Sequence, residues 1–327
     1  MEVRINTDEM ETQHVPVMLA EVLKFLQPHP EGLYIDGTVG GGGHTQAILE
    51  QSTPNGRVLG IDTDVQALAR VRRRLTEMVS SGRLVLAHGN FAELARLANE
   101  AGFVSMQGIL LDLGFSSDQM DNPERGFSFS VDGPLDMRFD AAQALSAADL
   151  VNSASEQELA DILWRYGEET RSRQIARRIV RARTKSAITS TTQLAGLVAM
   201  GVPYKRGAIH PATKTFQALR IAVNNELERL ETALPQMLDI LSAEGEKGGR
   251  MVIIAFHSLE DRLVKDFMRR EATDCLCPPR VPICVCGHKA RLRLLTPKPV
   301  VPTAAEVLAN SRARSAKLRA AERIISS

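Results

Sequence analysis

The chain has 327 residues, of which 44% are hydrophobic and 24% are charged. This length exceeds one average domain, so we expect a globular protein of two domains, and the composition excludes disordered and fibrous classes. Residues 1–13 are polar, and no apolar run reaches the length that spans a membrane. We therefore expect a cytoplasmic protein with no membrane association; the sequence specifies no oligomeric state.

Positive charge is concentrated in two places, although the net charge is only +1. One group falls within fifteen positions: Arg171, Arg173, Arg177, Arg178, Arg181, Arg183 and Lys185. A second group closes the chain: Arg312, Arg314, Lys317, Arg319 and Arg323. Each group alone is equally typical of a solvated helix face, but together they favour a phosphate-bearing polymer as the partner.

The first third of the chain alternates short apolar runs with helical patterns, which is typical of consecutive βα units around a parallel sheet. We predict four strands (33–35, 57–61, 83–87 and 108–111) and three helices (44–51, 65–79 and 91–101). A fifth buried strand, 251–256, follows only after about 140 residues, far beyond an ordinary crossover. The pattern therefore predicts an α/β core that is interrupted by an insert.

The predicted insert covers residues 118–214, so the core comprises residues 1–117 and 215–327. The insert begins with a loop rich in Gly, Pro and Phe and continues as Arg-rich helical sequence over 156–183. A long helix, 212–241, leads back to the core, and Pro235 is expected to end or kink it. Two further strands, 291–296 and 316–320, are predicted in the tail. We expect the insert to be a small helical domain that contacts RNA.

A glycine-rich turn, Asp36-Gly37-Thr38-Val39-Gly40-Gly41-Gly42-Gly43-His44, directly follows the first predicted strand. Successive glycines let the backbone turn sharply and approach a ligand closely. A phosphate-binding P-loop requires Lys-Ser/Thr after its last glycine, and a dinucleotide fingerprint requires G-x-G-x-x-G; neither is present. The turn instead fits the methyltransferase form, acidic-x-Gly-x-Gly-x-Gly, with Thr38 in place of its first glycine.

Polar residues also follow the next three predicted strands. Asp62 ends the second strand and can accept both hydroxyls of an unphosphorylated ribose, or it caps the next helix. Asn90 and Phe91 follow the third strand, where an adenine fits, and Asp112 ends the fourth. Because open α/β sheets bind ligands at the carboxyl ends of their strands, these residues predict one cofactor crevice. Asp62 alone does not separate S-adenosylmethionine from NAD.

The sequence resembles the bacterial ribosomal RNA small-subunit methyltransferase H family, also called MraW, whose members methylate N4 of a cytidine in 16S rRNA. The resemblance covers most of the chain in seven blocks: 14–18 (HVPVM), 36–44 (DGTVGGGGH), 112–117 (DLGFSS), 124–138 (ERGFSFSVDGPLDMR), 210–227 (HPATKTFQALRIAVNNEL), 254–265 (IAFHSLEDRLVK) and 310–323 (NSRARSAKLRAAER).

The resemblance implies a Rossmann-like methyltransferase core that is interrupted by a helical insert, with 16S rRNA of the small ribosomal subunit as the substrate. It also implies that S-adenosylmethionine is bound by Gly42, Gly43, His44, Asp62, Phe91, Asp112 and Gln119.

Asp112 is the candidate catalytic residue, because a carboxylate that accepts a hydrogen bond from cytosine N4 would localise its lone pair and take its proton. Methyltransferases that act on exocyclic amines of DNA often carry Asn/Asp-Pro-Pro-Tyr/Phe at this strand end. This chain has Asp112-Leu-Gly-Phe115 instead. Phe127, Phe129 and Tyr204 are candidates for stacking on RNA, although packing in a core is the commoner role for each.

Two clusters have open assignments. Ser258 with Asp261 has the spacing of a capping box, and His257 before it is either structural or directed into the active site. The four cysteines form two C-x-C pairs, Cys275 with Cys277 and Cys284 with Cys286. A structural zinc site is possible there but not favoured, because C-x-C pairs are less diagnostic than C-x₂-C pairs and cytosolic thiols are usually reduced and metal-free.

Two functions from other classes remain open from the residues alone. An NAD-dependent oxidoreductase is disfavoured by the incomplete dinucleotide fingerprint. A non-catalytic RNA-binding assembly protein leaves the polar residues at four strand ends unexplained.

Overall fold

The computed structural model describes residues 16–202, 210–244, 247–278 and 283–325. Its centre is a seven-stranded sheet with the order β3-β2-β1-β4-β5-β7-β6, in which β1 to β5 are parallel and β7 runs antiparallel to both β5 and β6. The strands are β1 (Leu33–Asp36), β2 (Arg57–Asp62), β3 (Leu84–His88), β4 (Gly108–Asp112), β5 (Arg250–Ala255), β6 (Leu292–Leu294) and β7 (Lys317–Arg323).

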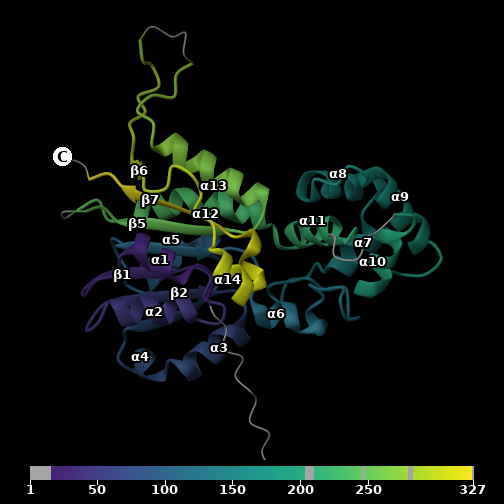
Figure 1. The fold of residues 1–327 in the computed structure, drawn as a ribbon, viewed down its shortest axis with the longest axis horizontal. Coiled ribbons are helices and arrows are strands. Elements are labelled where there is room, and N and C mark those ends of the chain that lie inside the picture. The colour runs from purple at the N-terminus through teal and green to yellow at the C-terminus, as the bar shows by residue number, and fades with distance from the viewer. Residues whose placement is uncertain (1–15, 203–209, 245–246, 279–282, 326–327) are drawn as a thin grey trace, which may run out of the picture.

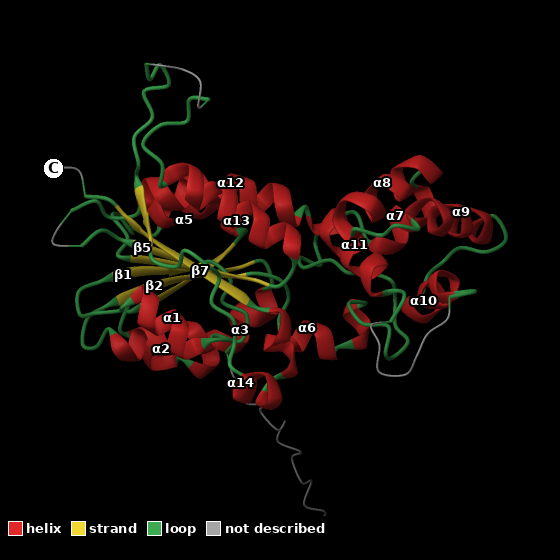
Figure 2. Cartoon of the chain, turned by 45° about the horizontal axis from the view of Figure 1, so that its top comes forward, coloured by secondary structure: helices red, strands yellow, loops and turns green. Residues whose placement is uncertain are grey.

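Helices cover both faces of this sheet, as Figure 2 shows. Strand residues alternate between the faces: Tyr34 packs in one apolar cluster and Ile35 in the other. The face with Tyr34 is covered by α1 (Leu19–Leu26), α2 (Gly43–Gln51), α3 (Val65–Arg74) and α4 (Thr76–Ser80). The opposite face is covered by α5 (Leu94–Glu100), α12 (Glu226–Ile240) and α13 (Ser258–Glu271). The sheet is therefore the middle of three layers.

The strand order reverses at β1, which pairs with β2 on one side and β4 on the other. In open α/β sheets the carboxyl ends of the strands at such a reversal diverge and leave a crevice for a ligand. The glycine-rich turn follows β1, and Asp112 is the last residue of β4. The topology confirms the predicted Rossmann-like α/β class and brings the two features together.

The predicted strands are confirmed with end shifts of a few residues, but two predicted helices are divided. The predicted helix 65–79 breaks at Leu75, whose backbone is not helical (φ −105°, ψ 36°). The predicted helix 91–101 begins as the 3₁₀ helix Phe91–Glu93, because the Asn90 side chain caps Ala92 N–H at 2.9 Å. Both differences divide a predicted helix into two consecutive pieces and leave the layers unchanged.

Pro235 does not end the long helix, contrary to the first of the two expected effects. The break falls at Asn225, which adopts the left-handed conformation (φ 48°, ψ 42°) between α11 (Thr213–Asn224) and α12. Pro235 lies inside α12 on its exposed side. A proline on the exposed side of a helix is tolerated, because water can bond the carbonyl that loses its N–H partner.

The interrupting segment forms a helical region with its own apolar cluster beside the sheet (Figure 1). Its helices are α6 (Ser117–Asp121), α7 (Ala147–Ser153), α8 (Glu156–Gly167), α9 (Ser172–Arg183), α10 (Thr191–Ala199) and α11. The predicted boundary at residue 214 falls inside α11, whose buried residues Phe216, Leu219 and Val223 belong to the cluster of the helical region. We therefore propose that the insert extends to Asn225.

The tail completes the edge of the core. The two predicted strands appear as β6 and β7, and α14 (Ala304–Ala309) lies between them in the sequence. Most of the second basic group is engaged within the protein: Arg319 pairs with Asp261 at 2.6 Å, and Arg312 with Asp121 at 2.6 Å. Arg319 is buried in its pair, whereas Arg312 and Arg314 are exposed, so contact of this group with a phosphate-bearing polymer stays a prediction for those two residues. Within the described ranges, no helix is long and apolar enough to cross a membrane.

Candidate active site

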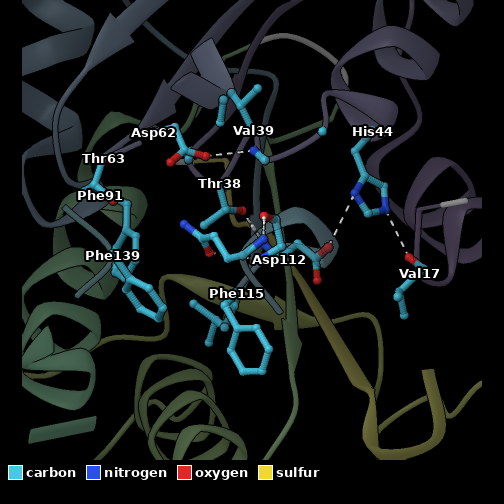
Figure 3. Close-up of a pocket in the computed structure, with 18 of the residues that line it drawn as sticks. Val17, Thr38, Val39, His44, Asp62, Thr63, Phe91, Asp112, Phe115 and Phe139 are labelled. Carbon is cyan, nitrogen blue, oxygen red and sulfur yellow. Dashed lines mark hydrogen bonds and ion pairs between the residues drawn. The ribbon is translucent and has the colours of Figure 1, made fainter. Parts of the chain in front are cut away.

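A cavity opens at the carboxyl ends of β1, β2 and β4 (Figure 3). The glycine-rich turn forms one wall, and residues from α6, α12 and the loop after β5 complete it. The seven residues that the resemblance implies for the cofactor all line this one cavity: Gly42, Gly43, His44, Asp62, Phe91, Asp112 and Gln119.

Buried polar contacts hold the glycine-rich turn in shape. Asp36 is buried at the end of β1, accepting hydrogen bonds from Thr45 Oγ1 at 2.6 Å and from the Thr38 N–H at 3.2 Å. Gly42 has φ 77°, and a Cβ atom there would lie 2.8 Å from Val71 Cγ2. Only glycine satisfies both the left-handed backbone and the close approach of α3 at this position.

Asp62 supports the same turn from β2. Its Oδ2 accepts the Gly40 N–H at 2.7 Å and its Oδ1 accepts the Asp64 N–H at 2.8 Å. The cap of α3 is Asp64, which accepts from Gln66 N–H at 2.9 Å, so Asp62 does not cap that helix. Each oxygen of Asp62 keeps a second lone pair, which is available to a ligand hydroxyl in the cavity.

Gln119 and Arg125 connect the cavity wall to the helical region. Gln119 is buried in α6, where its Oε1 accepts the Ser116 N–H at 3.0 Å. Arg125 Nη1 contacts Asp64 Oδ2 at 3.2 Å and Arg125 Nη2 donates to the Phe139 carbonyl at 2.8 Å. These contacts fix the start of the insert against the core beside the cavity.

Asp112 and His44 face each other across the cavity (Figure 3). His44 Nε2 lies 2.9 Å from the Val17 carbonyl, which can only accept, so this nitrogen carries a proton. The other ring nitrogen, Nδ1, lies 3.7 Å from Asp112 Oδ2. Asp112 Oδ1 is buried and has no hydrogen-bond partner among the described residues. A buried acceptor of this kind calls for a donor from a ligand.

Carboxyl groups dominate the electrostatics of the cavity. Burial raises the pKa of Asp112 well above its usual value, and the nearby charges of Asp36 and Glu260 raise it further. Burial also raises the pKa of Asp36 to about 6, against the opposing hydrogen bonds from Thr45 and Thr38. A cationic ligand would oppose this shift and favour the ionised form of Asp112.

Two acidic residues that line the cavity, Glu226 and Glu260, were missed by the sequence analysis. Arg220 from α11 forms a two-pronged ion pair with Glu226 of α12 at 2.8 Å, and both are almost fully buried. Burial alone would raise the pKa of Glu260, but nearby His257 and Arg220 hold it below its usual value. Glu226 and Glu260 both line the cavity. Only their position in the fold shows this, because neither follows a strand of the first third.

The N-terminus of α13 differs from the predicted capping box. His257, rather than Ser258, is the N-cap residue, and its side chain accepts from the Glu260 N–H at 3.4 Å. Glu260 Oε2 in turn accepts the Phe256 N–H at 2.8 Å. Ser258 instead donates to Glu168 Oε2 of the helical region at 3.0 Å. The box therefore begins one residue earlier than predicted, and His257 takes the capping role that was expected of Ser258.

Two aromatic candidates for RNA stacking lie in the core of the helical region. Phe127 is buried and its ring stacks on Phe115 at 5.3 Å between centroids. Phe129 packs edge-on against Phe216 at 4.7 Å. Core packing, the commoner role, is therefore the observed one for both. Tyr204 lies outside the described residues.

Comparison with known proteins decides the family. Residues 11–324 match the model of the MraW methylase family. The chain belongs to the MraW methylase family. A relative from Thermomicrobium roseum, named ribosomal RNA small subunit methyltransferase H, is 57% identical over 97% of this chain and 95% of its own. Proteins of the same name from Geobacter sulfurreducens and Trichlorobacter lovleyi are 51% and 50% identical over 96% of this chain and 100% and 99% of their own lengths.

Membership of the MraW family makes the chain a methyltransferase that uses S-adenosylmethionine, and it removes the NAD-dependent oxidoreductase and the non-catalytic assembly protein as alternatives. The cavity fits this cofactor on its own terms. Asp112 presents an unpartnered buried oxygen, and each oxygen of Asp62 keeps a lone pair for a ligand hydroxyl.

Proposed function

We propose that this protein methylates the N4 amine of a cytidine in 16S rRNA of the small ribosomal subunit, in the cytoplasm. The relatives' shared name supports ribosomal RNA of the small subunit as the substrate. The single observation that carries the chemistry is the unpartnered, buried Oδ1 of Asp112 at the end of β4.

The seven cavity residues would hold the cofactor: Gly42, Gly43, His44, Asp62, Phe91, Asp112 and Gln119. We propose that Asp62 accepts the ribose hydroxyls, that Phe91 lies against the adenine, and that the glycine-rich turn approaches the remainder. S-adenosylmethionine, when bound, supplies a methyl group on a positively charged sulfur, which is already a strong electrophile. The protein therefore has to position the amine and exclude water.

Asp112 performs the proton chemistry in this proposal. Its Oδ1 accepts a hydrogen bond from the cytosine N4 amine, which localises the nitrogen lone pair and orients it in line with the methyl group. As the new bond forms, the amine loses a proton to this carboxylate. The raised pKa of Asp112 suits the acceptor role, because a carboxylate of ordinary acidity binds a proton weakly near neutral pH.

The helical region supplies the RNA contacts in this proposal. On α9, Arg173, Arg177 and Arg181 are exposed and recur every four residues, so they form one stripe that Lys185 extends beyond the helix. Arg177 pairs with Glu156 at 3.4 Å, a contact between exposed groups that an RNA phosphate can replace at little cost. The stripe would hold backbone phosphates without reading the sequence.

A transfer assay tests the proposal. The purified protein is incubated with labelled S-adenosylmethionine and small ribosomal subunits from cells that lack this methylation. We expect label in 16S rRNA with the wild-type chain and none with Asp112→Ala, while calorimetry records binding of S-adenosylmethionine but not of NAD to the wild type. Undiminished turnover by Asp112→Ala would remove this residue from the chemistry.

A further inference from the structure

An arm of the chain projects from the core between α13 and β6 (Figure 1) and carries all four cysteines. Apolar burial does not hold its described parts together. The side chains of Leu276, Ile283 and Val285 are 45%, 75% and 80% exposed. Polar contacts tie the base of the arm to α13: Arg291 Nε lies 3.0 Å from Glu271 Oε2. Beyond the base, something other than a hydrophobic core has to fix the chain.

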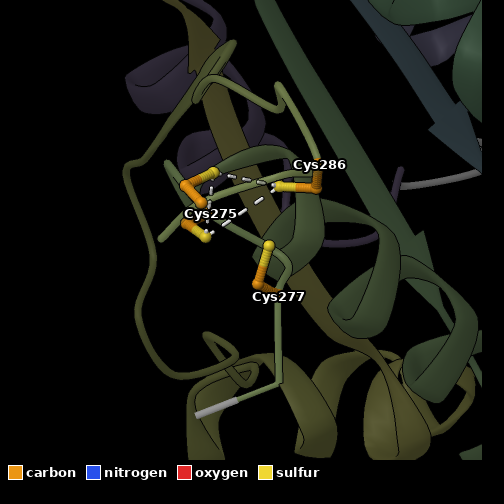
Figure 4. Close-up of side chains that lie close together, drawn as sticks. Cys275, Cys277 and Cys286 are labelled. Carbon is orange, nitrogen blue, oxygen red and sulfur yellow. Dashed lines mark hydrogen bonds between the residues drawn. The ribbon is translucent and has the colours of Figure 1, made fainter. Parts of the chain in front are cut away.

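The four cysteine sulfurs converge in this arm (Figure 4). Cys284 Sγ lies 3.4 Å from Cys275 Sγ and 3.6 Å from Cys286 Sγ, and the Cys275 and Cys286 sulfurs are 3.9 Å apart. The Cys277 sulfur completes the group, with all four within 4.8 Å of one another. None of the four is in a disulfide.

We propose that Cys275, Cys277, Cys284 and Cys286 bind one structural zinc ion as a tetrahedral Cys₄ site. Four sulfurs at the usual Zn–S distance of about 2.3 Å stand about 3.8 Å apart along the edges of the tetrahedron. The three sulfur–sulfur separations of 3.4 to 3.9 Å lie close to that edge length. The site is closed to substrate, because all four positions belong to cysteines.

Backbone hydrogen bonds support the same arrangement symmetrically. The middle residue of each C-x-C pair donates its N–H to a sulfur of the other pair: Leu276 to Cys286 at 3.3 Å, and Val285 to Cys277 at 3.4 Å. Donors to the sulfurs stabilise thiolate ligands and orient them in metal sites. Each C-x-C pair, although undiagnostic in the sequence, thus supplies two of the four sulfurs and one N–H donor to the same site.

Metal-free thiols, the expectation from the sequence, fit these observations less well. Free cysteines are among the most buried residue types in proteins, yet three of these four are exposed and the fourth is half-buried. Four adjacent exposed thiols are prone to oxidation, whereas a bound metal ion would protect them and cross-link the two C-x-C pairs. A zinc ion here would replace the missing apolar core of the arm.

Metal content of the full chain tests the site. The protein is expressed in zinc-supplemented medium, purified without a histidine tag and analysed by elemental mass spectrometry and X-ray absorption. We expect about one zinc per chain, with four sulfur neighbours at about 2.3 Å. Stoichiometric iron in place of zinc would overturn the identity of the metal.

A matched pair of variants separates the ligands from the rest of the arm. The double variant Cys275→Ser, Cys286→Ser should lose its zinc and become sensitive to proteolysis between Ala272 and Arg291, while the melting of the core stays unchanged. Val285→Ala, whose side chain is exposed in the same arm, should keep its zinc. A wild-type chain that lacks metal and reacts at all four thiols at once would overturn the proposal.

Discussion

At the scale of single residues, Asp112 is the residue on which the proposed proton chemistry depends. We predict that Asp112→Asn lowers methyl transfer by about 10²–10⁴-fold, the usual contribution of an acid–base group, because an amide cannot take the proton. The same change should raise the free energy of unfolding of the ligand-free protein near neutral pH, because it removes a buried carboxyl whose raised pKa costs stability at pH values above the pKa of the unfolded chain. Single-turnover kinetics and chemical denaturation measure the two effects. A variant that loses activity by unfolding would contradict this separation.

The raised pKa of Asp112 also predicts that ligand binding depends on pH. A bound cation favours the ionised form of this carboxyl and so lowers its raised pKa, which means that binding releases protons at pH values between the free and the bound pKa. The affinity for S-adenosylmethionine should therefore rise with pH until the free protein itself loses that proton. Calorimetry in buffers of different ionisation enthalpy measures the proton release. Asp112→Asn, as the control, should release fewer protons, and an equal release by both proteins would refute the assignment.

The sequence revealed the site residues that follow strands, and missed those that the fold brings in from a distance. The glycine-rich turn, Asp62 and Asp112 are recognisable because parallel strands end at one edge of a sheet. Glu226 and its ion-pair partner Arg220 belong to helices that return from the insert, and no local pattern shows that Glu226 lines the cavity. The tertiary path of the chain decides their position.

At the scale of elements, the start of α2 depends on Gly42. We predict that Gly42→Ala destabilises the protein by clearly more than 1 kcal/mol and weakens cofactor binding, because the new Cβ would lie 2.8 Å from Val71 Cγ2. Gly82 is the matched control, since it has a similar φ of 73° and no atom within 4 Å of its Cβ position. Gly82→Ala should lower the free energy of unfolding by only about 1 kcal/mol, the cost of placing a Cβ atom on a left-handed backbone. Equal melting temperatures for the two variants would contradict the steric argument.

The elements themselves were largely predictable, and the errors have physical causes. Buried strands such as β4 and β5 read as short apolar runs because helices cover both their faces. The break between α11 and α12 was misplaced, because a proline on the exposed side of a helix leaves its unpaired carbonyl to water. Asn225 is one of the few residue types that tolerate the left-handed conformation, but its sequence position alone does not require that conformation.

At the scale of the whole molecule, the helical region and the core have separable tasks. We predict that Arg173→Ala, Arg181→Ala lowers RNA affinity and reduces the slope of log affinity against log salt by about 1.5, because each lost phosphate contact removes 0.7 to 0.9. Cofactor binding should stay unchanged. The double variant Arg269→Ala, Arg270→Ala at the far end of α13 removes the same charge and should leave the slope unaltered. Equal effects of the two double variants would show that only net charge matters.

The identity of the methylated atom is the most direct test of the whole account. Small ribosomal subunits are treated with the protein and S-adenosylmethionine, their 16S rRNA is digested, and the nucleosides are separated and identified by mass spectrometry against synthetic standards. The account predicts N4-methylcytidine at one position, absent when Asp112 is replaced by alanine. Methylation at carbon 5 or on another base, by a protein that binds the cofactor normally, would contradict it.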